Sequence, residues 1–251
     1  MALLDADIWK LTLTLAVGLV PALIWLWFWL KQDQAQPEPK KMILLTFILG
    51  GLVTFPAGLL SGFYLEQLEI FFDRSLNFRN PEVAIGITPT LYVLIFLIGA
   101  FFEETLKLIA AGPSFLSRFF DEPIDAMIYL ITAGLGFAAF ENALYFSFFL
   151  PDEVFLSLSQ ITIRFLGSTI LHTVCSAIIG AFIAFNWHRS FGQKLLATGA
   201  GLILATFLHT AFNFSIMNLS ANYSHWLTFL TLWVVAIIII LLFEKVKGLK
   251  Y

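Results

Sequence analysis

Residues 91–112 read LYVLIFLIGAFFEETLKLIAAG, a run that is apolar at both ends and charged in its middle. Its length matches the roughly 20 apolar residues that an α-helix needs to cross a bilayer. Glu103, Glu104 and Lys107 nevertheless lie inside it. An ionised side chain near the bilayer centre costs at least about 2.5–3.5 kcal/mol. These three residues therefore need either partners or a function that uses them.

Apolar segments of similar length recur along nearly the whole chain. Of its 251 residues, 59% are hydrophobic and 12% are charged, and the mean hydropathy is +0.88. This composition excludes an ordinary soluble domain. The pattern predicts an all-α, polytopic transmembrane helical bundle of about seven spans. We place the spans at residues 9–30, 42–65, 88–112, 124–150, 161–187, 195–218 and 225–243.

The connections after the third span are too short to form separate domains, so residues 1–251 are expected to form a single integral membrane domain. Nine Lys and Arg residues fall on one side of the predicted topology and four on the other. The positive-inside rule then places the N-terminus outside and the C-terminus in the cytoplasm. The longest outer connection, residues 66–87, is expected to include a helix lying in the membrane interface. No basic face is present, so nucleic acid is not an expected partner.

Small residues cluster in two of the predicted spans. They are Ala133, Gly134, Gly136, Ala138 and Ala139 in the fourth span, and Gly199, Ala200, Gly201 and Ala205 in the sixth. Small side chains allow helix backbones in a membrane to approach closely. We expect both spans to pack tightly against their neighbours.

Further polar residues lie inside other spans, chiefly Glu141, His172 and His209. Ser176 follows His172 by four residues and Asn213 follows His209 by four, which places each pair on one helix face. With a rise of about 1.5 Å per residue, the three groups lie roughly 3–5 Å outward of their span centres, in one layer. Glu103 and Glu104 fall roughly 5–7 Å toward the cytoplasm, a difference that helix tilt could close.

Two chemistries suit this set of residues. In the first, Glu141, His172 and His209 bind Zn²⁺ with an open position for water, and Glu103 or Glu104 is the general base. In the second no metal is present. A glutamate of the pair then activates water directly, while His209 and Asn213 stabilise the oxyanion. Both chemistries predict a hydrolase, in which Lys107 tunes the carboxylate pair.

The same residues resemble the PrsW family of intramembrane proteases. The resemblance rests on Glu103-Glu104-x-x-Lys107, on Asp125 ahead of GLGFAAFENALY (134–145), on His172, and on HTAFNF (209–214). PrsW proteins are related to the CAAX prenyl endopeptidase and bacteriocin-processing clan. In that clan a Phe-x-x-x-His motif stands where Phe137 to Glu141 stand here. The resemblance covers about residues 90–218, with residues 1–65 and 225–251 as accessory spans.

The resemblance implies an endopeptidase that cuts a peptide bond in or near a transmembrane segment of another membrane protein. The substrate it implies is a single-span protein, in the best-known case an anti-sigma factor. The family has been described both as metal-dependent and as glutamic-type. It also implies a location in a bacterial cytoplasmic membrane.

Two other functional classes remain open from the residues alone. Intramembrane Glu, Lys and His residues also serve proton-coupled transporters and channels, which usually show two related halves with broken helices. No such pair is visible here. The second alternative is a non-catalytic scaffold for another membrane protein. For Glu103, Glu104 and Lys107, the simplest non-catalytic interpretation is a buried ion pair that sets helix register.

Overall fold

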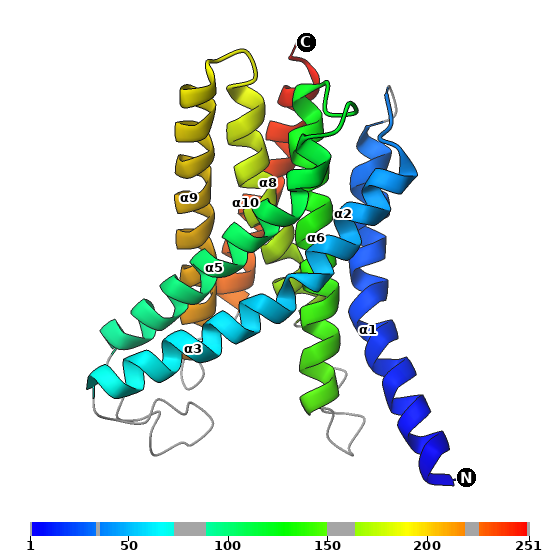
Figure 1. The fold of residues 1–251 in the computed structure, drawn as a ribbon, viewed down its shortest axis with the longest axis vertical. Coiled ribbons are helices and arrows are strands. Elements are labelled where there is room, and N and C mark those ends of the chain that lie inside the picture. The colour runs from blue at the N-terminus through cyan, green and yellow to red at the C-terminus, as the bar shows by residue number, and fades with distance from the viewer. Residues whose placement is uncertain (1, 34–35, 73–88, 150–163, 219–225, 250–251) are drawn as a thin grey trace.

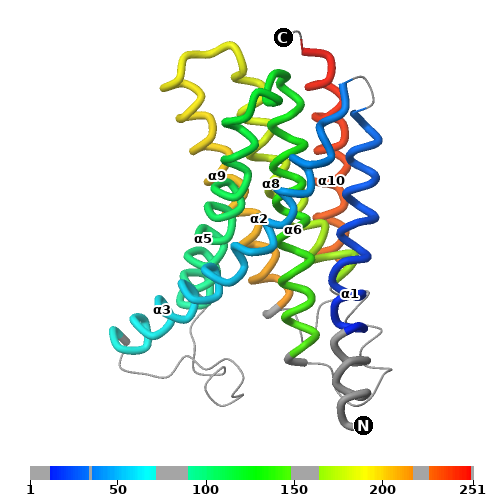
Figure 2. Tube along the Cα trace, turned by 45° about the vertical axis from the view of Figure 1, so that its right-hand side comes forward, coloured from blue at the N-terminus to red at the C-terminus, as the bar shows by residue number. Residues whose placement is uncertain are grey.

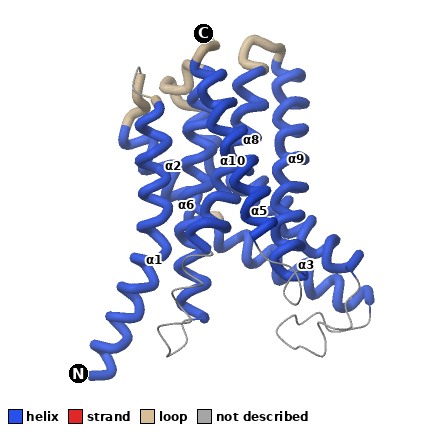
Figure 3. Tube along the Cα trace, turned by 180° about the vertical axis from the view of Figure 1, so that it is seen from behind, coloured by secondary structure: helices blue, strands red, loops and turns tan. Residues whose placement is uncertain are grey.

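The computed structural model describes residues 2–33, 36–72, 89–149, 164–218 and 226–249. Within these ranges all regular structure is helical, joined by short loops (Figure 3). The helices are α1 (Ala2–Gln32), α2 (Lys40–Leu52), α3 (Thr54–Phe72), α5 (Pro89–Phe115), α6 (Pro123–Phe149), the π-helical turn η1 (Arg164–Ser168), α8 (Thr169–Phe185), α9 (Phe191–Asn218) and α10 (Trp226–Lys247). The predicted all-α fold class is confirmed.

Six stretches of the described chain are long and apolar enough to cross a membrane. They are Thr12–Gln32, Lys40–Phe71, Pro123–Ser147, Arg164–Phe185, Phe191–Ile216 and Trp226–Lys247. Helix α5 is not among them, although its 27 residues are enough to span a bilayer. Its three central charges, Glu103, Glu104 and Lys107, separate it from the others. The protein is an integral membrane protein.

The predicted span 42–65 differs from the structure, where it is broken into α2 and α3 and continues to Phe72. Pro56 explains the break, because it has no N–H to donate to the carbonyl of Leu52. Val53 stands between the two helices, and the Thr54 hydroxyl donates to the Gly51 carbonyl at 2.7 Å. The interface helix expected within residues 66–87 overlaps the end of α3 and otherwise falls at residues 73–88, outside the described residues.

Helix α6 is the centre of the bundle and packs against α1, α2 and α8 (Figure 2). Glycines make these contacts close. A Cβ added at Gly134 would lie 2.5 Å from the Ser176 hydroxyl of α8, and one added at Gly136 would clash with the Phe47 carbonyl of α2. The predicted tight packing of the fourth span is therefore present.

Helix α9 shows this close packing at only one of its two glycines in the predicted cluster. A Cβ at Gly201 would lie 3.1 Å from the Cα of Ile179, whereas one at Gly199 would meet nothing within 4 Å. The small residues of the sixth span thus contact α8 on one side, and Gly199 faces away from the described helices.

Helices α3 and α5 are strongly inclined relative to α6, α8, α9 and α10 (Figure 1). The two ends of the chain lie at opposite ends of the molecule in the same view. The inclined helix α5 packs against α9, α6 and α2.

Candidate active site

Four helices bring their intramembrane polar residues to one place. Helix α5 supplies Glu103, Glu104 and Lys107, α6 supplies Glu141, α8 supplies His172, and α9 supplies His209 and Asn213. Five of these seven residues line a single cavity of about 420 Å³. They are Glu103, Glu141, His172, His209 and Asn213. The two that do not line it, Glu104 and Lys107, are fully buried behind it.

The buried ion pair of Glu104 and Lys107 lies behind the cavity and supports the site. The Lys107 ammonium donates to Glu104 Oε1 at 2.5 Å, and both side chains are 0% exposed. The ring of Phe137 lies 4.9 Å from the same ammonium, a cation–π contact that partly replaces lost hydration. Phe137 also packs against the His172 ring, with centroids 5.2 Å apart. The Phe of the Phe-x-x-x-Glu motif therefore supports both neighbours.

His172 is held at both ring nitrogens. Lys107 Nζ lies 2.9 Å from Nδ1, and Glu141 Oε2 lies 2.9 Å from Nε2. Since an ammonium can only donate, Nδ1 is the acceptor and Nε2 carries the proton that Glu141 accepts. This arrangement fixes both the tautomer and the orientation of the ring.

His209 has the complementary arrangement. Its Nδ1 lies 2.7 Å from Glu104 Oε1, and a carboxylate can only accept, so Nδ1 donates. The Nε2 lone pair is left facing Glu103, whose Oε2 is 3.7 Å away. The two histidine rings lie edge to face with centroids 5.1 Å apart. Glu104 thus orients His209 in the way that a carboxylate orients a metal-ligating or catalytic imidazole.

Within the described chain, each of the two adjacent glutamates has one buried oxygen without a hydrogen-bond partner, its Oε2, but only Glu103 lines the cavity. Among the described residues, Glu103 Oε2 has no hydrogen-bond partner, although it is buried at the edge of the cavity. A buried carboxylate oxygen left unpaired is costly, so a water molecule or a cation is the expected neighbour. Of the adjacent glutamates, Glu103 faces the cavity and Glu104 faces the lysine.

Arg164 is a site residue that the sequence interpretation missed, because it was counted as a charge of an outer loop. It lies in η1, and π-helical turns often occur at functional sites. Its guanidinium lies 3.4 Å from Glu141 Oε1, donates to Asn142 at 2.9 Å, and covers the Tyr145 ring at 3.7 Å. Its position within a predicted span, eight residues before His172, was the available signal.

The structure brings Glu141, His172 and His209 together, as the shared depth predicted. Glu103 and Glu104 reach the same place, so the offset toward the cytoplasm that the sequence left open does not separate them from the other groups. The tilt of α5 is the physical reason (Figure 1). Asp125 does not belong to the site, because its carboxylate accepts the backbone N–H groups of Asp121 and Glu122 at the start of α6.

The donor atoms fit a metal ion. Glu103, His172 and His209 offer ligand atoms that all lie within 4.8 Å of one another. Glu104, Cys175 and His209 form a second such group, fully buried. Glu141 is in neither group within the described residues, and its carboxylate instead contacts His172 and Arg164. The cavity favours the first group, because Glu103, His172 and His209 all line it, whereas Glu104 and Cys175 do not.

Residues 38–242 match the family described as PrsW family intramembrane metalloprotease. No curated protein and no solved structure matches the chain. The matched range includes every residue of the site. It also includes the whole of η1 and of six α-helices, namely α2, α3, α5, α6, α8 and α9.

Proposed function

Because this chain belongs to the PrsW family of intramembrane metalloproteases, and is therefore a membrane-embedded peptidase, we propose that the cavity between Glu103, His172 and His209 is its active site. The family resemblance and the enzyme class predicted from the sequence are confirmed. Family membership favours a hydrolase over the transporter and scaffold alternatives. The residue roles below are our proposal.

The observation that carries the proposal is that the two adjacent glutamates make different contacts. Glu103 borders the cavity with an unpaired oxygen beside His209 Nε2, whereas Glu104 is bonded to Lys107 and to His209 Nδ1. A water molecule or metal ion in contact with Glu103 Oε2 and His209 Nε2 would satisfy both groups. We therefore assign Glu103 to contact with the group that fills this gap, a metal ion or the reacting water, and Glu104 to the positioning of His209.

Glu103, His172 and His209 would hold the metal ion, and Zn²⁺ suits a set of two imidazoles and one carboxylate. Such an ion supplies Lewis acidity and lowers the pKa of water. With such an ion bound, Glu141, which also lines the cavity, would be the residue that accepts a proton from water. This assignment exchanges the roles of Glu103 and Glu141 relative to the prediction from the sequence. Glu103 offers an unpaired oxygen within 4.8 Å of ligand atoms of both imidazoles, whereas the Glu141 carboxylate is already engaged by His172 and Arg164.

A metal-free chemistry is the second candidate, and the hydrogen bonds of His172 favour it. Both ring nitrogens already have partners, Lys107 and Glu141, and the proton on Nε2 would have to leave before that atom could bind a metal. In this chemistry Glu103 takes a proton from water as the water oxygen attacks the scissile carbonyl carbon. It returns the proton to the amide nitrogen as the C–N bond breaks.

Asn213 completes the site as the donor for the developing oxyanion. It lies one turn after His209 on α9 and lines the same cavity. An amide N–H aimed at an oxyanion in a site that excludes water typically contributes 10²–10³ in rate, by about 3–4 kcal/mol. The amide has no charge of its own, so it does not disturb the carboxylates nearby.

The substrate is a membrane protein, and we propose that it has a single span. The anti-sigma factor implied by the family resemblance is one candidate. The cavity, at about 420 Å³, is near the small end of ligand pockets, and an α-helix with its side chains is about 10–12 Å across. The segment that is cut must therefore unwind locally, so helix-breaking residues near the cut are expected.

We also propose a bacterial cytoplasmic membrane as the location, with the N-terminus outside and the C-terminus in the cytoplasm. The support is the distribution of Lys and Arg, nine against four. The opposite placement of the two chain ends agrees with it (Figure 1).

The test uses the purified protein in liposomes with a single-span model substrate that carries Gly-Pro in its membrane segment. A matched substrate carries Leu-Leu there. Glu103→Gln is compared with Glu244→Gln, an exposed glutamate of α10 that pairs with Lys247. We expect the first variant to lose at least about 100-fold in cleavage rate and the second to be unchanged. Equal cleavage by Glu103→Gln and wild type would overturn the assignment.

Elemental analysis of the same preparations decides between the two chemistries. One Zn²⁺ per chain, lost together with activity in His209→Ala and after chelation, supports the metal site. Full cleavage activity without metal and in the presence of a chelator supports Glu103 as the sole base. Equal cleavage of the Gly-Pro and Leu-Leu substrates would contradict local unwinding.

A further inference from the structure

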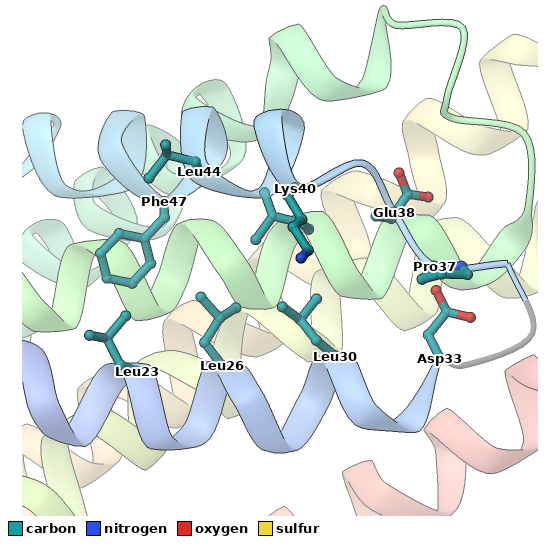
Figure 4. Close-up of a pocket in the computed structure, with 10 residues that line it drawn as sticks. Leu23, Leu26, Leu30, Asp33, Pro37, Glu38, Lys40, Leu44 and Phe47 are labelled. Atoms are coloured by element: carbon teal, nitrogen blue, oxygen red, sulfur yellow. The ribbon is translucent and has the colours of Figure 1, made fainter.

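A second cavity lies far from the active site along the chain, between α1 and α2. It has a volume of about 300 Å³ and is lined by Leu23, Leu26, Leu30, Asp33, Pro37, Glu38, Lys40, Ile43, Leu44 and Phe47. None of these residues lines the active-site cavity. Figure 4 shows the leucines of α1 facing α2, with the Lys40 side chain reaching toward them.

The inner part of this cavity is apolar. Leu23, Leu26 and Leu30 recur at helical spacing on α1, so they form one continuous stripe. Leu23 and Leu44 are 49% and 59% exposed, so the cavity opens sideways to the surroundings of the helices. For a membrane protein these surroundings are the hydrocarbon of the bilayer. An acyl chain can enter the slot without leaving an apolar medium.

The outer end of the cavity is charged with both signs. Lys40 begins one apolar stretch and Gln32 ends the other, so Asp33, Glu38 and Lys40 lie where the chain reaches the membrane surface. An ammonium and two carboxylates around one opening complement a headgroup that itself carries both charges. A purely anionic lipid headgroup would be repelled by the carboxylates of Asp33 and Glu38. An uncharged headgroup would give neither these carboxylates nor the Lys40 ammonium an opposite charge.

Within the described residues, no ion pair joins Asp33 or Glu38 to a basic side chain. Asp33 is 6% exposed, and burial raises its pKa while Lys247 acts in the opposite direction. The Lys247 ammonium, however, donates to Glu244 at 2.7 Å. Burial also raises the pKa of Glu38, which accepts a hydrogen bond from Tyr129. A primary ammonium bound here would supply the missing positive partner and would favour the ionised form of both carboxyls.

We propose that the cavity between α1 and α2 binds a membrane phospholipid with a primary ammonium in its headgroup, of the phosphatidylethanolamine class. One acyl chain lies along the leucine stripe of α1. The phosphate contacts Lys40, and the ammonium donates to Asp33 and Glu38. The site is separate from the proposed protease site, and its occupancy can be measured without any cleavage assay.

The experiment is native mass spectrometry of the full chain released from vesicles that contain equal amounts of phosphatidylethanolamine, phosphatidylglycerol and phosphatidylcholine. We expect phosphatidylethanolamine to be retained about tenfold more than either other lipid, the effect of one charge-assisted hydrogen bond. Phosphatidylcholine has no N–H to donate, and phosphatidylglycerol has no ammonium. Equal retention of all three lipids would overturn the proposal.

Paired variants locate the site. Asp33→Asn, which is nearly isosteric, should remove the preference for phosphatidylethanolamine, and Lys40→Gln should lower retention where the exposed neighbour Lys41→Gln does not. Leu44→Trp should fill the slot and expel the lipid, while Leu45→Trp, which does not line the cavity, should leave it bound. Unchanged phosphatidylethanolamine retention in Leu44→Trp would contradict the proposal. If that variant instead lost cleavage of the model substrate, the cavity would be a substrate dock.

Discussion

Glu104 and Lys107, one turn apart on α5, form an ion pair of 2.5 Å in which neither side chain is exposed. The pair holds both histidines of the site, because Glu104 accepts from His209 and Lys107 donates to His172. A structural ion pair and a catalytic constellation are therefore parts of one network. This network explains why three charges occur together in the middle of an apolar helix.

Removing the lysine of this pair should be strongly destabilising. Lys107→Met leaves Glu104 buried without a counter-charge, and such changes typically cost about 3–5 kcal/mol. The double variant Glu104→Gln with Lys107→Met should recover part of that loss, since no unpaired charge remains. Thermal unfolding in detergent measures both. Lys247→Met is the matched control, because it removes an exposed pair with the same spacing, worth less than about 1 kcal/mol. Equal effects of Lys107→Met and Lys247→Met would contradict the network.

Arg164 should prove important for the reaction rather than for folding. Arg164→Met removes the guanidinium beside Glu141 and Asn142 at the cavity, and we expect the cleavage rate to fall by about 10–100-fold. Arg164→Lys should retain part of the activity, because it keeps the charge but loses the planar fork. Arg189→Met, an exposed arginine after α8, serves as control. A fall in unfolding temperature that parallels the loss of activity would instead indicate a structural role.

The contact between α6 and α8 should tolerate no added methyl group. In Gly134→Ala the new Cβ would lie 2.5 Å from the Ser176 hydroxyl and 2.9 Å from the His172 carbonyl. We expect a loss of stability of about 1–3 kcal/mol and slower cleavage, since α8 must shift and carry His172 with it. Gly199→Ala meets nothing within 4 Å and should be neutral or up to about 1 kcal/mol more stable. If the two alanine variants unfold at the same temperature, the close packing described here is wrong.

The loop before α2 should make stability depend on pH. Burial raises the pKa of Glu38 above its ordinary value of 4.5, so the folded state favours the protonated carboxyl. That contribution is complete below about pH 4.5 and is lost as the pH rises through the raised pKa of the folded state. The unfolding temperature of the wild type should therefore fall as the pH rises above about 4.5. Glu38→Gln, which can still accept from Tyr129, should fall less. A variant with the same pH slope as wild type would exclude Glu38 as the source.

The helices were predictable because hydrophobic length is a strong signal in a membrane protein. Six of the seven predicted spans correspond to a described helix within a few residues at most ends, and α1 begins earlier than expected. The break at Val53 was missed, because the apolar run continues through it and only Pro56 marks the lost hydrogen bond. The direction of α5 also could not be predicted, because tilt depends on packing against neighbours rather than on the composition of one segment.

The residues that belong to the site were largely predictable from the sequence. The hydrogen bonds and ion pairs among them were not. Intramembrane Glu and His residues stand out in any sequence, since lipid tolerates them poorly. The sequence does not show that Glu103 faces the cavity while Glu104 faces Lys107. Adjacent side chains on a helix point in different directions, and only the packing of the helix decides which of them faces the cavity. The contact between Arg164 and Glu141 could not be predicted for the same reason, because it joins two different helices.

The three charges of α5 also bear on how this protein enters a membrane during its synthesis. The partners that complete their network, His172 and His209, lie 65 and 105 residues beyond their respective partners on α5. A growing chain thus exposes α5 to lipid long before α8 and α9 exist. Its stable burial has to wait for the later helices, which makes α5 the segment expected to depend most on assistance from the insertion machinery.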